Sequence, residues 1–406
     1  MAGITGMGTT FNLPNYHGEL IGLTPTETPL LSMAGGVGGG KQTTSVEFEW
    51  QTYDLRDPQI RPRLEGADAP TAEARVRVNV KNVVQVYQEA VTTSYTKQAA
   101  SGQLATTQAA PFTTYDSLGV GNPVTNEHAW QVQQALKQIA RDANFSFWHG
   151  KKNVPIDNSA ARQTAGLLSV ITTNKTFALA PVTAASATDT ITSAGHGMNN
   201  GDQVVFVDVD AATNVRVDRA YYVVNKATDT FKVAATAGGS AIALGTAAPV
   251  YVQVSGTAAK GVTVDLVNTF IQGIFDNGGL TQGETRTLFV PSVQKTRITK
   301  AYATSNNYQT NVTPGHIVGG VAVDRITTDF GELNLVVERA LPKDCIVAVS
   351  VDEIDPVFLS IPGKGVLFEE ELAKTGAAEK SQIYGEIGLK YGAEHDHGIL
   401  RGLAIV

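Results

Sequence analysis

The apolar positions between Asn126 and Gly150 recur at helical spacing. Asn122-Pro123 and Thr125 supply start signals for a first turn, and Gly150 followed by Lys151-Lys152 supplies a stop. The pattern predicts a helix over 126–150, on the order of 35 Å long. Alone, it fits an ordinary core helix as well as a long strut. The predicted buried stripe consists of Val132, Leu136, Ile139, Ala143 and Phe147.

Alternation with period two predicts two strands before this helix. Val46, Phe48 and Trp50 alternate with polar residues, and the apolar positions of 74–80 do the same. An antiparallel register that opposes Glu49 to Arg75 also opposes Glu47 to Arg77. We therefore predict that register for a hairpin over 46–82. The segment between the strands, DLRDPQIRPRLEGADAPTAE, is long and dense in both signs of charge, which leaves a solvated loop and an intersubunit contact as alternatives.

Residues 1–45 are rich in Gly, Thr and Pro and lack sustained periodicity. The prolines of TPTETPLL, residues 24–31, predict an extended or turn-like backbone. We expect an arm that buries little within its own subunit and is ordered by a neighbouring subunit.

Short strand patterns separated by Asn-Asn-Gly-Asp and Gly-Gly turns predict a small all-β unit over 181–258. Its AGHGMNNGDQVVF and YYVVNKATDTFKV segments resemble a β module that recurs in phage structural proteins. Helical spacing returns in GVTVDLVNTFIQGIFDNGG, and a buried strand then leads through Pro291 into a short helix. This order of elements predicts a second compact α/β unit, followed by alternating strands to the C-terminus.

Composition narrows the function. The chain has 406 residues, 42% of them hydrophobic, and a formal net charge of −7, which disfavours a phosphate-binding groove but not the enclosure of DNA. Its single cysteine, Cys345, excludes an intramolecular disulfide and is expected to be a buried residue at a strand start. Because no signal peptide or apolar run of 18 residues is present, we expect a cytoplasmic chain.

Several short motifs imitate catalytic or metal sites. GGVGGGK at 35–41 lacks the hydroxyl residue and the following helix of a phosphate loop, and Asp329-Phe330-Gly331 lacks the other kinase motifs. His196 and the pair His395 and His397 are expected in turns or at an exposed strand end, because no further ligands stand at metal spacing. The Glu369-Glu370-Glu371 run is expected to be a solvated face. We therefore predict neither enzyme activity nor a cofactor.

Two C-terminal segments carry a family resemblance. ITTDFGELNLVVERALPKD and LAKTGAAEKSQIYGEIGLKYGAEHDHGILRGL closely resemble the major capsid proteins of tailed bacteriophages, as do TPTETPLLS and VPSVQKTRI. The matching motif residues are Phe330, Gly331, Leu333, Arg339, Pro342, Lys374, Thr375, Gly376 and Glu386.

The resemblance implies an α+β fold, the capsid fold shared by tailed phages and herpesviruses. It implies an N-terminal arm (1–45), an extended loop hairpin (46–82), a peripheral domain (83–180 and 351–406) with a spine helix (126–150), and an axial domain (259–350). The β unit (181–258) would be an inserted domain. The chain lacks the long helical scaffolding segment with which many such proteins begin, so a separate scaffold or none is expected.

The implied function is self-assembly through hexamers and pentamers into an icosahedral shell that encloses double-stranded DNA. Portal, scaffold and decoration proteins are the further expected partners, and the virion is the expected location. Within the extended loop we expect intersubunit contacts from Arg56, Asp57, Arg61, Arg63, Glu65 and Asp68. A tail-fibre or decoration protein and a bacterial nanocompartment shell are the alternatives.

Overall fold

The computed structural model divides the chain into two compact units, one of residues 1–27, 86–143 and 360–386 and the other of residues 28–85, 144–359 and 387–406. The structure describes residues 23–404 apart from 57, 72, 100–126, 179–181, 186–188, 194–195, 209–213, 216–218, 245–248, 255–260, 280–285, 306–323 and 374–375. Asp57, Lys374 and Thr375 of the sequence predictions therefore lie outside the described residues.

The long predicted helix is confirmed as α4 (Glu127–His149). Its predicted stripe is buried at Val132, Ile139, Ala143 and Phe147. The prediction of a buried side chain is wrong for Leu136, which is 37% exposed. Helical spacing predicts on which face of the helix a side chain lies, but it does not predict how much of that face other residues cover. At Leu136 the face is only partly covered.

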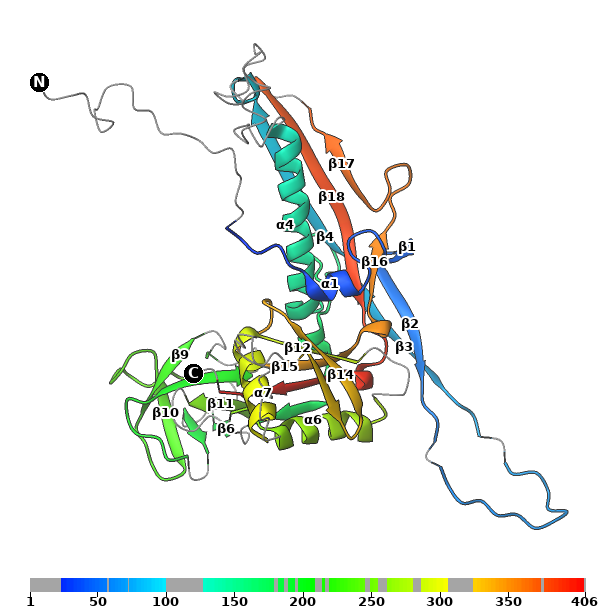
Figure 1. The fold of residues 1–406 in the computed structure, drawn as a ribbon, viewed down its shortest axis with the longest axis vertical. Helices are drawn as coiled ribbons and strands as arrows, with labels where there is room; N and C mark the ends of the chain where they lie inside the picture. The colour runs from blue at the N-terminus through cyan, green and yellow to red at the C-terminus, as the bar shows by residue number, and fades with distance from the viewer. Residues whose placement is uncertain are drawn as a thin grey trace, which may run out of the picture. The chain divides into compact units, whose positions relative to one another are not determined.

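The first unit places part of α4 beside β-structure (Figure 1). It contains α2 (Tyr95–Ala99), β17 (Leu367–Glu371) and most of β4 (Gln85–Ser94) and β18 (Ala378–Lys390). β4 and β17 both pair with β18. The ring of His128 joins helix and sheet: its Nδ1 lies 3.1 Å from Thr93 Oγ1 and its Nε2 lies 3.0 Å from Ser381 Oγ.

The second unit is built on a six-stranded sheet with strand order β13-β14-β12-β15-β19-β5. Figure 1 shows α6 and α7 beside this sheet, and one apolar core joins helices and strands. The strands are β5 (Lys175–Phe177), β12 (Arg286–Val290), β13 (Arg325–Thr328), β14 (Gly331–Val337), β15 (Ile346–Ser350) and β19 (Gly398–Arg401). The helices are α5 (Leu167–Val170), α6 (Val264–Asp276) and α7 (Ser292–Ser305).

α6 follows its sequence signals closely. Thr263 caps its start by accepting a hydrogen bond from the Leu266 amide at 3.2 Å, and Gly278 follows its end with a φ of 92°. Phe270 and Ile274 are buried in the core, whereas Phe275 is half exposed and its ring lies 5.2 Å from that of Phe330. Cys345 is buried immediately before β15, as predicted.

Residues 182–254 form a closed six-stranded barrel with strand order β10-β7-β6-β11-β8-β9. Its interior is filled by side chains that include Phe206, Tyr221 and Phe231. The barrel is therefore a packed core rather than a ligand-holding cup. Its strands are β6 (Val182–Ala185), β7 (Thr190–Thr192), β8 (Gln203–Asp208), β9 (Ala220–Val224), β10 (Thr230–Ala234) and β11 (Pro249–Val254).

The prediction of an extended or turn-like backbone over residues 24–31 is wrong for residues 29–31. Pro29–Met33 is helix α1, in which Leu30 and Leu31 are buried and the Leu31 amide donates to Asn144 Oδ1 at 3.1 Å. Pro29 begins the helix, where a missing N–H costs nothing. The prediction took proline only as a helix breaker.

Two short regions complete the second unit. β1 (Lys41–Thr43) pairs in parallel with β16 (Asp355–Leu359), and the Lys41 ammonium lies 2.7 Å from the Asp355 carboxylate. The phosphate-loop lookalike thus leads into strands, as predicted. Turns η1 (Val351–Glu353) and η2 (Glu394–Asp396) lie before β16 and β19.

The hairpin exists, but its predicted register is wrong. β2 (Glu47–Tyr53) and β3 (Arg77–Val83) oppose Glu49 to Lys81 and Glu47 to Val83 rather than to Arg75 and Arg77. The shift is six residues, an even number, so each side chain keeps its predicted face. The predicted register was chosen because it opposes unlike charges across the strands, but each exposed ion pair contributes only a few tenths of a kcal/mol to stability.

Burial accounts for the observed register of this β2–β3 ribbon. Val83 and Val84 are completely buried at its base, and Trp50 Nε1 donates to the Gly392 carbonyl at 2.8 Å. The Trp50 ring also meets Tyr391 edge to face, with 4.8 Å between centroids. Burying two apolar side chains and an indole outweighs two surface ion pairs.

Candidate intersubunit contact loop

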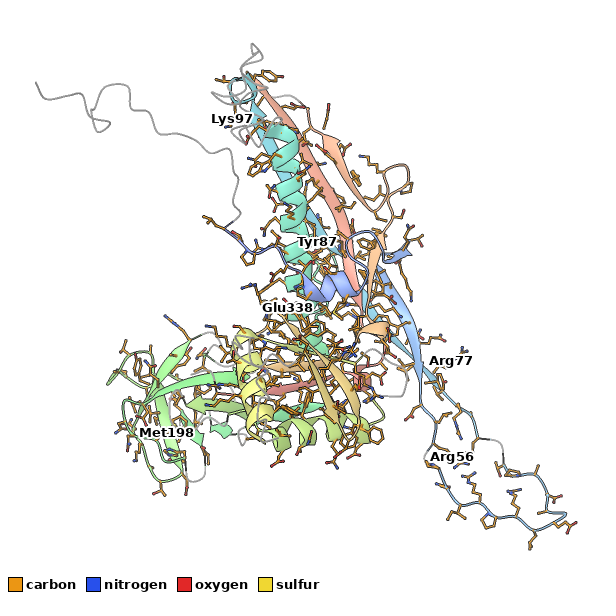
Figure 2. All side chains as sticks on the ribbon, viewed as in Figure 1. Arg56, Arg77, Tyr87, Lys97, Met198 and Glu338 are labelled. Carbon is orange, nitrogen blue, oxygen red and sulfur yellow. The ribbon has the colours of Figure 1, made fainter. Side chains whose placement is uncertain are left out.

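The β2–β3 ribbon carries the predicted contact residues on a long loop, residues 54–76, which extends beyond the ends of both strands (Figure 2). The described part of this loop is largely exposed to solvent and contains no helix or strand. Loops of this length without regular structure are commonly functional or disordered. The side chains on it therefore decide what the loop can contact.

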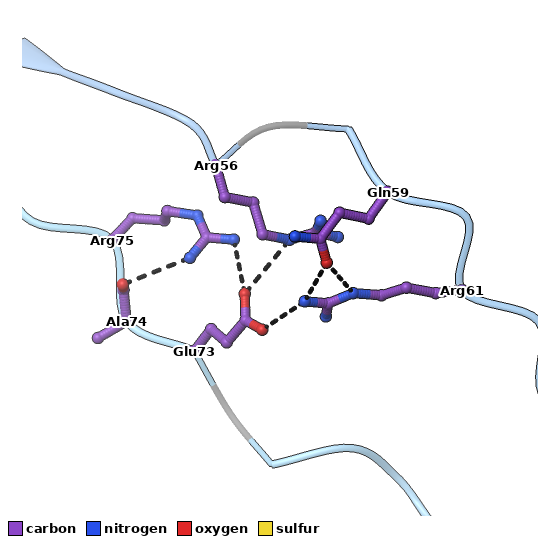
Figure 3. Close-up of polar contacts among 6 residues, drawn as sticks. All are labelled: Arg56, Gln59, Arg61, Glu73, Ala74 and Arg75. Atoms are coloured by element: carbon purple, nitrogen blue, oxygen red, sulfur yellow. Dashed lines mark hydrogen bonds and ion pairs between the residues drawn. The ribbon is translucent and has the colours of Figure 1, made fainter.

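The structure brings three arginines of the loop together around one carboxylate, as Figure 3 shows. Glu73 Oε1 lies 2.9 Å from Arg61 Nη2, and Glu73 Oε2 lies 3.0 Å from Arg75 Nη2 and 3.3 Å from Arg56 Nε. Arg61 also donates to Gln59 Oε1 at 3.2 and 3.3 Å. We call Arg56, Arg61, Glu73 and Arg75 the Glu73 cluster.

The Glu73 cluster joins the outgoing and returning segments of the loop, since Arg56 and Arg61 lie on one segment and Glu73 and Arg75 on the other. The hydrogen bond from Arg61 holds the pKa of the Glu73 carboxyl below its usual range, with further contributions from Arg75 and Arg56. Glu73 is therefore ionised at neutral pH, and its charge is opposed by three cations.

Arg63, Glu65 and Asp68, the other described contact residues, are not among the four residues of this cluster. Arg63 Nη1 donates to the Asp68 carbonyl at 2.7 Å and so closes the tip of the loop on itself. The Glu65 and Asp68 side chains are exposed. The sequence prediction correctly placed charge on this loop, but it did not foresee that Arg56 and Arg61 bind within the loop, nor did it include Glu73.

The loop also presents large apolar side chains that the sequence analysis did not select. Ile60 is 97% exposed and Leu64 is 85% exposed, and Leu55 and Val76 are mostly exposed as well. The signal in the sequence was an apolar residue among charged neighbours at each of these positions. Exposed apolar groups gathered on one segment are typical of a surface that becomes buried in a complex.

The described family-motif residues occupy structural positions. Phe330 and Gly331 form the turn between β13 and β14, where Arg286 donates to the Phe330 carbonyl. Leu333 is buried in the sheet core, and the Pro342 carbonyl accepts from the Cys345 amide at 3.2 Å. Arg339 lies just after β14.

In the first unit, Gly376 has a φ of 92° just before β18, a conformation that favours glycine. The Glu386 carboxylate is buried and accepts a hydrogen bond from the Tyr384 hydroxyl at 2.7 Å. Within their own units, the described motif residues stabilise turns and packing.

The histidine motifs have structural partners. His395 lies in turn η2, as predicted, but His397 is completely buried rather than exposed: its Nδ1 accepts from the Ser350 amide at 3.3 Å and its Nε2 lies 2.7 Å from the Tyr391 carbonyl. His196 Nδ1 accepts from the Met198 amide at 3.1 Å. Within the described residues, no group of three His, Cys, Asp or Glu side chains is placed to hold a metal ion.

Among solved structures, the chain is similar to the capsid of cyanophage A-1(L), with a TM-score of 0.56 and 8% identity over 98% of each chain. It is also similar to the capsid of Myoviridae phage XM1, with a TM-score of 0.48 and 12% identity over 98% of this chain and 99% of that one. At such low identity the first likeness shows a shared fold. None of the helices in the described residues is long and apolar enough to cross a membrane.

No curated protein matches the chain. The family described as SU10 major capsid protein matches residues 3–404, which is nearly the whole chain. This match agrees with the resemblance of the C-terminal segments to tailed-phage capsid proteins, and it leaves the tail-fibre, decoration and nanocompartment alternatives with less support. The chain belongs to the SU10 major capsid protein family.

Proposed function

We propose that copies of this chain assemble through hexamers and pentamers into an icosahedral shell around double-stranded DNA, with loop 54–76 as a contact between neighbouring subunits. Family membership supports self-association into a shell. The observation that carries the role of the loop is its set of exposed apolar side chains, led by Ile60 and Leu64, on a segment that buries almost nothing in its own subunit.

In this proposal the charged and apolar residues of the loop have different tasks. The Glu73 cluster and the Arg63–Asp68 contact hold the loop in shape, while Leu55, Ile60 and Leu64 supply apolar area to a neighbour. A preformed loop loses less conformational entropy on binding than a flexible one. Arg56, Asp57, Arg61, Arg63, Glu65 and Asp68 remain proposed contact residues, at the polar rim of that interface.

The proposed division into parts follows the sequence ranges: an arm (1–45), an extended loop (46–82), a peripheral domain (83–180 and 351–406) with α4 as spine, an inserted domain (181–258) and an axial domain (259–350). The closed barrel within 182–254 supports the inserted domain. We further propose assembly in the host cytoplasm with a portal protein and separate scaffold or decoration proteins. The negative net charge suits a container that must release its DNA.

Electron microscopy and sedimentation of the purified recombinant chain test the proposal. Closed shells, or rings of five and six subunits, are the expected products. A chain that remains monomeric alone and with the scaffold protein of its virus would contradict self-assembly. Rod-shaped trimers would indicate a tail-fibre protein, and shells that retain an enzyme cargo would indicate a nanocompartment.

A further inference from the structure

The loop of residues 151–163, which follows α4, has an apolar apex. Asn153 and Gln163 exchange two backbone hydrogen bonds at 3.0 and 3.1 Å, and Asn153 Nδ2 donates to the Ala161 carbonyl at 2.8 Å. Ile156, between these closing contacts, is fully exposed. The apex therefore adds nothing to the core of its own subunit. We call residues 151–163 the Ile156 loop.

The Ile156 loop is held in shape before any partner arrives. Besides the closing contacts, the Ser159 amide donates to the Asp157 carboxylate at 3.0 Å, which forms a local turn, and Pro155 fixes its own φ. An exposed isoleucine on such a loop can be buried in a complex with little further loss of conformational entropy.

A groove of about 650 Å³ lies against the β2–β3 ribbon. One wall is formed by ribbon side chains and the other by the body of the second unit, and Trp50 closes on Gly392 near their junction. The lining includes Val76, Val78, Val80, Val170, Thr52 and Tyr391. The four valines form an apolar part of the lining against which a branched aliphatic side chain can pack, and residues such as Thr172, Asn277 and Glu394 make the rest of the lining polar.

The groove and the Ile156 loop approach the ribbon from opposite faces. Thr52 and Val78 are cross-strand partners on the groove face. Glu47 points to the other face, because neighbouring residues of a strand alternate, and its carboxylate lies 3.7 Å from Lys152 Nζ at the start of the Ile156 loop. One copy thus presents the Ile156 loop on one face of its ribbon and the groove on the other.

We infer that Ile156 of one copy inserts into the valine-lined groove of the next copy. The occupant is a second copy because the Ile156 loop and the groove lie on opposite faces of one element, and such a head-to-tail contact generates a ring where the rotation between copies closes. The exposed charges of the two surfaces are of opposite sign, because Lys151 lies in the Ile156 loop and Asp54 lines the groove. This inference rests on the proposed self-assembly and specifies one contact between neighbouring copies.

Cysteine cross-linking tests the contact directly. Ile156→Cys chains and Val78→Cys chains are mixed in equal amounts, assembled and oxidised. We expect a disulfide-linked dimer on a non-reducing gel from the mixture and from neither variant alone. The native Cys345 does not interfere, because it is buried and its burial raises the pKa of its thiol.

The matched control replaces Val78→Cys by Gln51→Cys, an exposed position at the same level on the other face of the ribbon. Several-fold more dimer with Val78→Cys supports the inference. Assembled particles with equal or no cross-linking in both mixtures overturn the inference and leave the proposed function standing. If the unsubstituted chain forms no particles in any condition, both fail.

A second measurement avoids cysteine. Ile156→Asp is expected to lower the assembled fraction several-fold, whereas Ile156→Leu preserves it. Because Ile156 is fully exposed, neither change should alter the thermal unfolding of the free subunit. Equal assembled fractions for the two variants would overturn the inference.

Discussion

Glu73 joins the two segments of the extended loop. It is exposed, so each of its ion pairs is weak, but three guanidinium groups converge on it from both segments of the loop. The pairs act together, because loss of the one carboxylate leaves three like charges near one another. The effect should appear in local order rather than in global stability.

Glu73→Gln is expected to make the loop more susceptible to limited proteolysis without changing the unfolding temperature of the subunit. Glu65→Gln is the matched control, since Glu65 lies on the same loop and the described contacts give it no ion pair. Equal cleavage rates for the two variants would mean that the cluster does not hold the loop.

The same cluster predicts a pH dependence. Because the folded pKa of Glu73 is lowered, its contribution is fully present above the ordinary glutamate pKa of about 4.3 and is lost as pH falls through the lowered value. Proteolysis of the loop by an acid-tolerant protease should therefore increase below about pH 4 in the unsubstituted chain. In Glu73→Gln it should be fast at every pH.

At the scale of elements, the turn between β13 and β14 depends on the backbone freedom of glycine. Gly331 has a φ of 122°, and a Cβ built there would collide with the Arg286 guanidinium, which donates to the Phe330 carbonyl. A residue with a side chain at position 331 would therefore strain the backbone and displace the Arg286 guanidinium.

Gly331→Ala is expected to destabilise the subunit by about 1–3 kcal/mol, measured by denaturant unfolding. Gly273→Ala is the control: Gly273 lies within α6 and a Cβ there meets no atom within 4 Å, so this change should be neutral or stabilise by up to about 1 kcal/mol. Similar losses in both variants would contradict the turn argument.

The extended loop as an element should govern assembly rather than folding. Changing Arg61 and Arg63 together to Glu replaces one of the three cations beside Glu73 by a like charge and removes the contact to the Asp68 carbonyl. We expect a folded subunit by circular dichroism that gives few shells by sedimentation. A normal shell yield from this double variant would exclude the loop as an essential contact.

In the whole molecule, the barrel is a separate structural unit whose deletion should leave the rest of the fold intact. Its first and last strands, β6 and β11, are neighbours that pair Thr183 with Pro249, so entry and exit of the chain lie close together. The barrel has its own buried core. Adjacent first and last strands and a separate core are typical of an inserted domain that supplies no part of the core of the domain around it.

Deletion of residues 181–258 with a short linker should therefore leave a chain that still forms shells. If the barrel tightens the shell, these shells should dissociate at lower denaturant concentration than those of the full chain, as measured by light scattering. Unchanged stability would reject the tightening role and favour a surface that binds a partner.

Local patterns along the chain were enough to predict most helices and strands and the family. Helical spacing and caps are local properties, so the ends of α4 were predicted within one residue and α6 was predicted within segment 261–279. The alternation of 46–50 and 74–80 gave the ribbon faces correctly. The resemblance to the major capsid proteins of tailed bacteriophages was carried by two long C-terminal segments, 326–344 and 372–403, together with TPTETPLLS and VPSVQKTRI.

Contacts between distant parts of the chain could not be predicted from these local patterns. The register of β2 and β3 follows the burial of Val83 and the anchoring of Trp50, both of which depend on segments far away in sequence. Helix α1 forms where Leu30 and Leu31 find a core, and the arginines of the loop find Glu73 across its two segments. Such contacts arise from long-range packing, which no local pattern encodes.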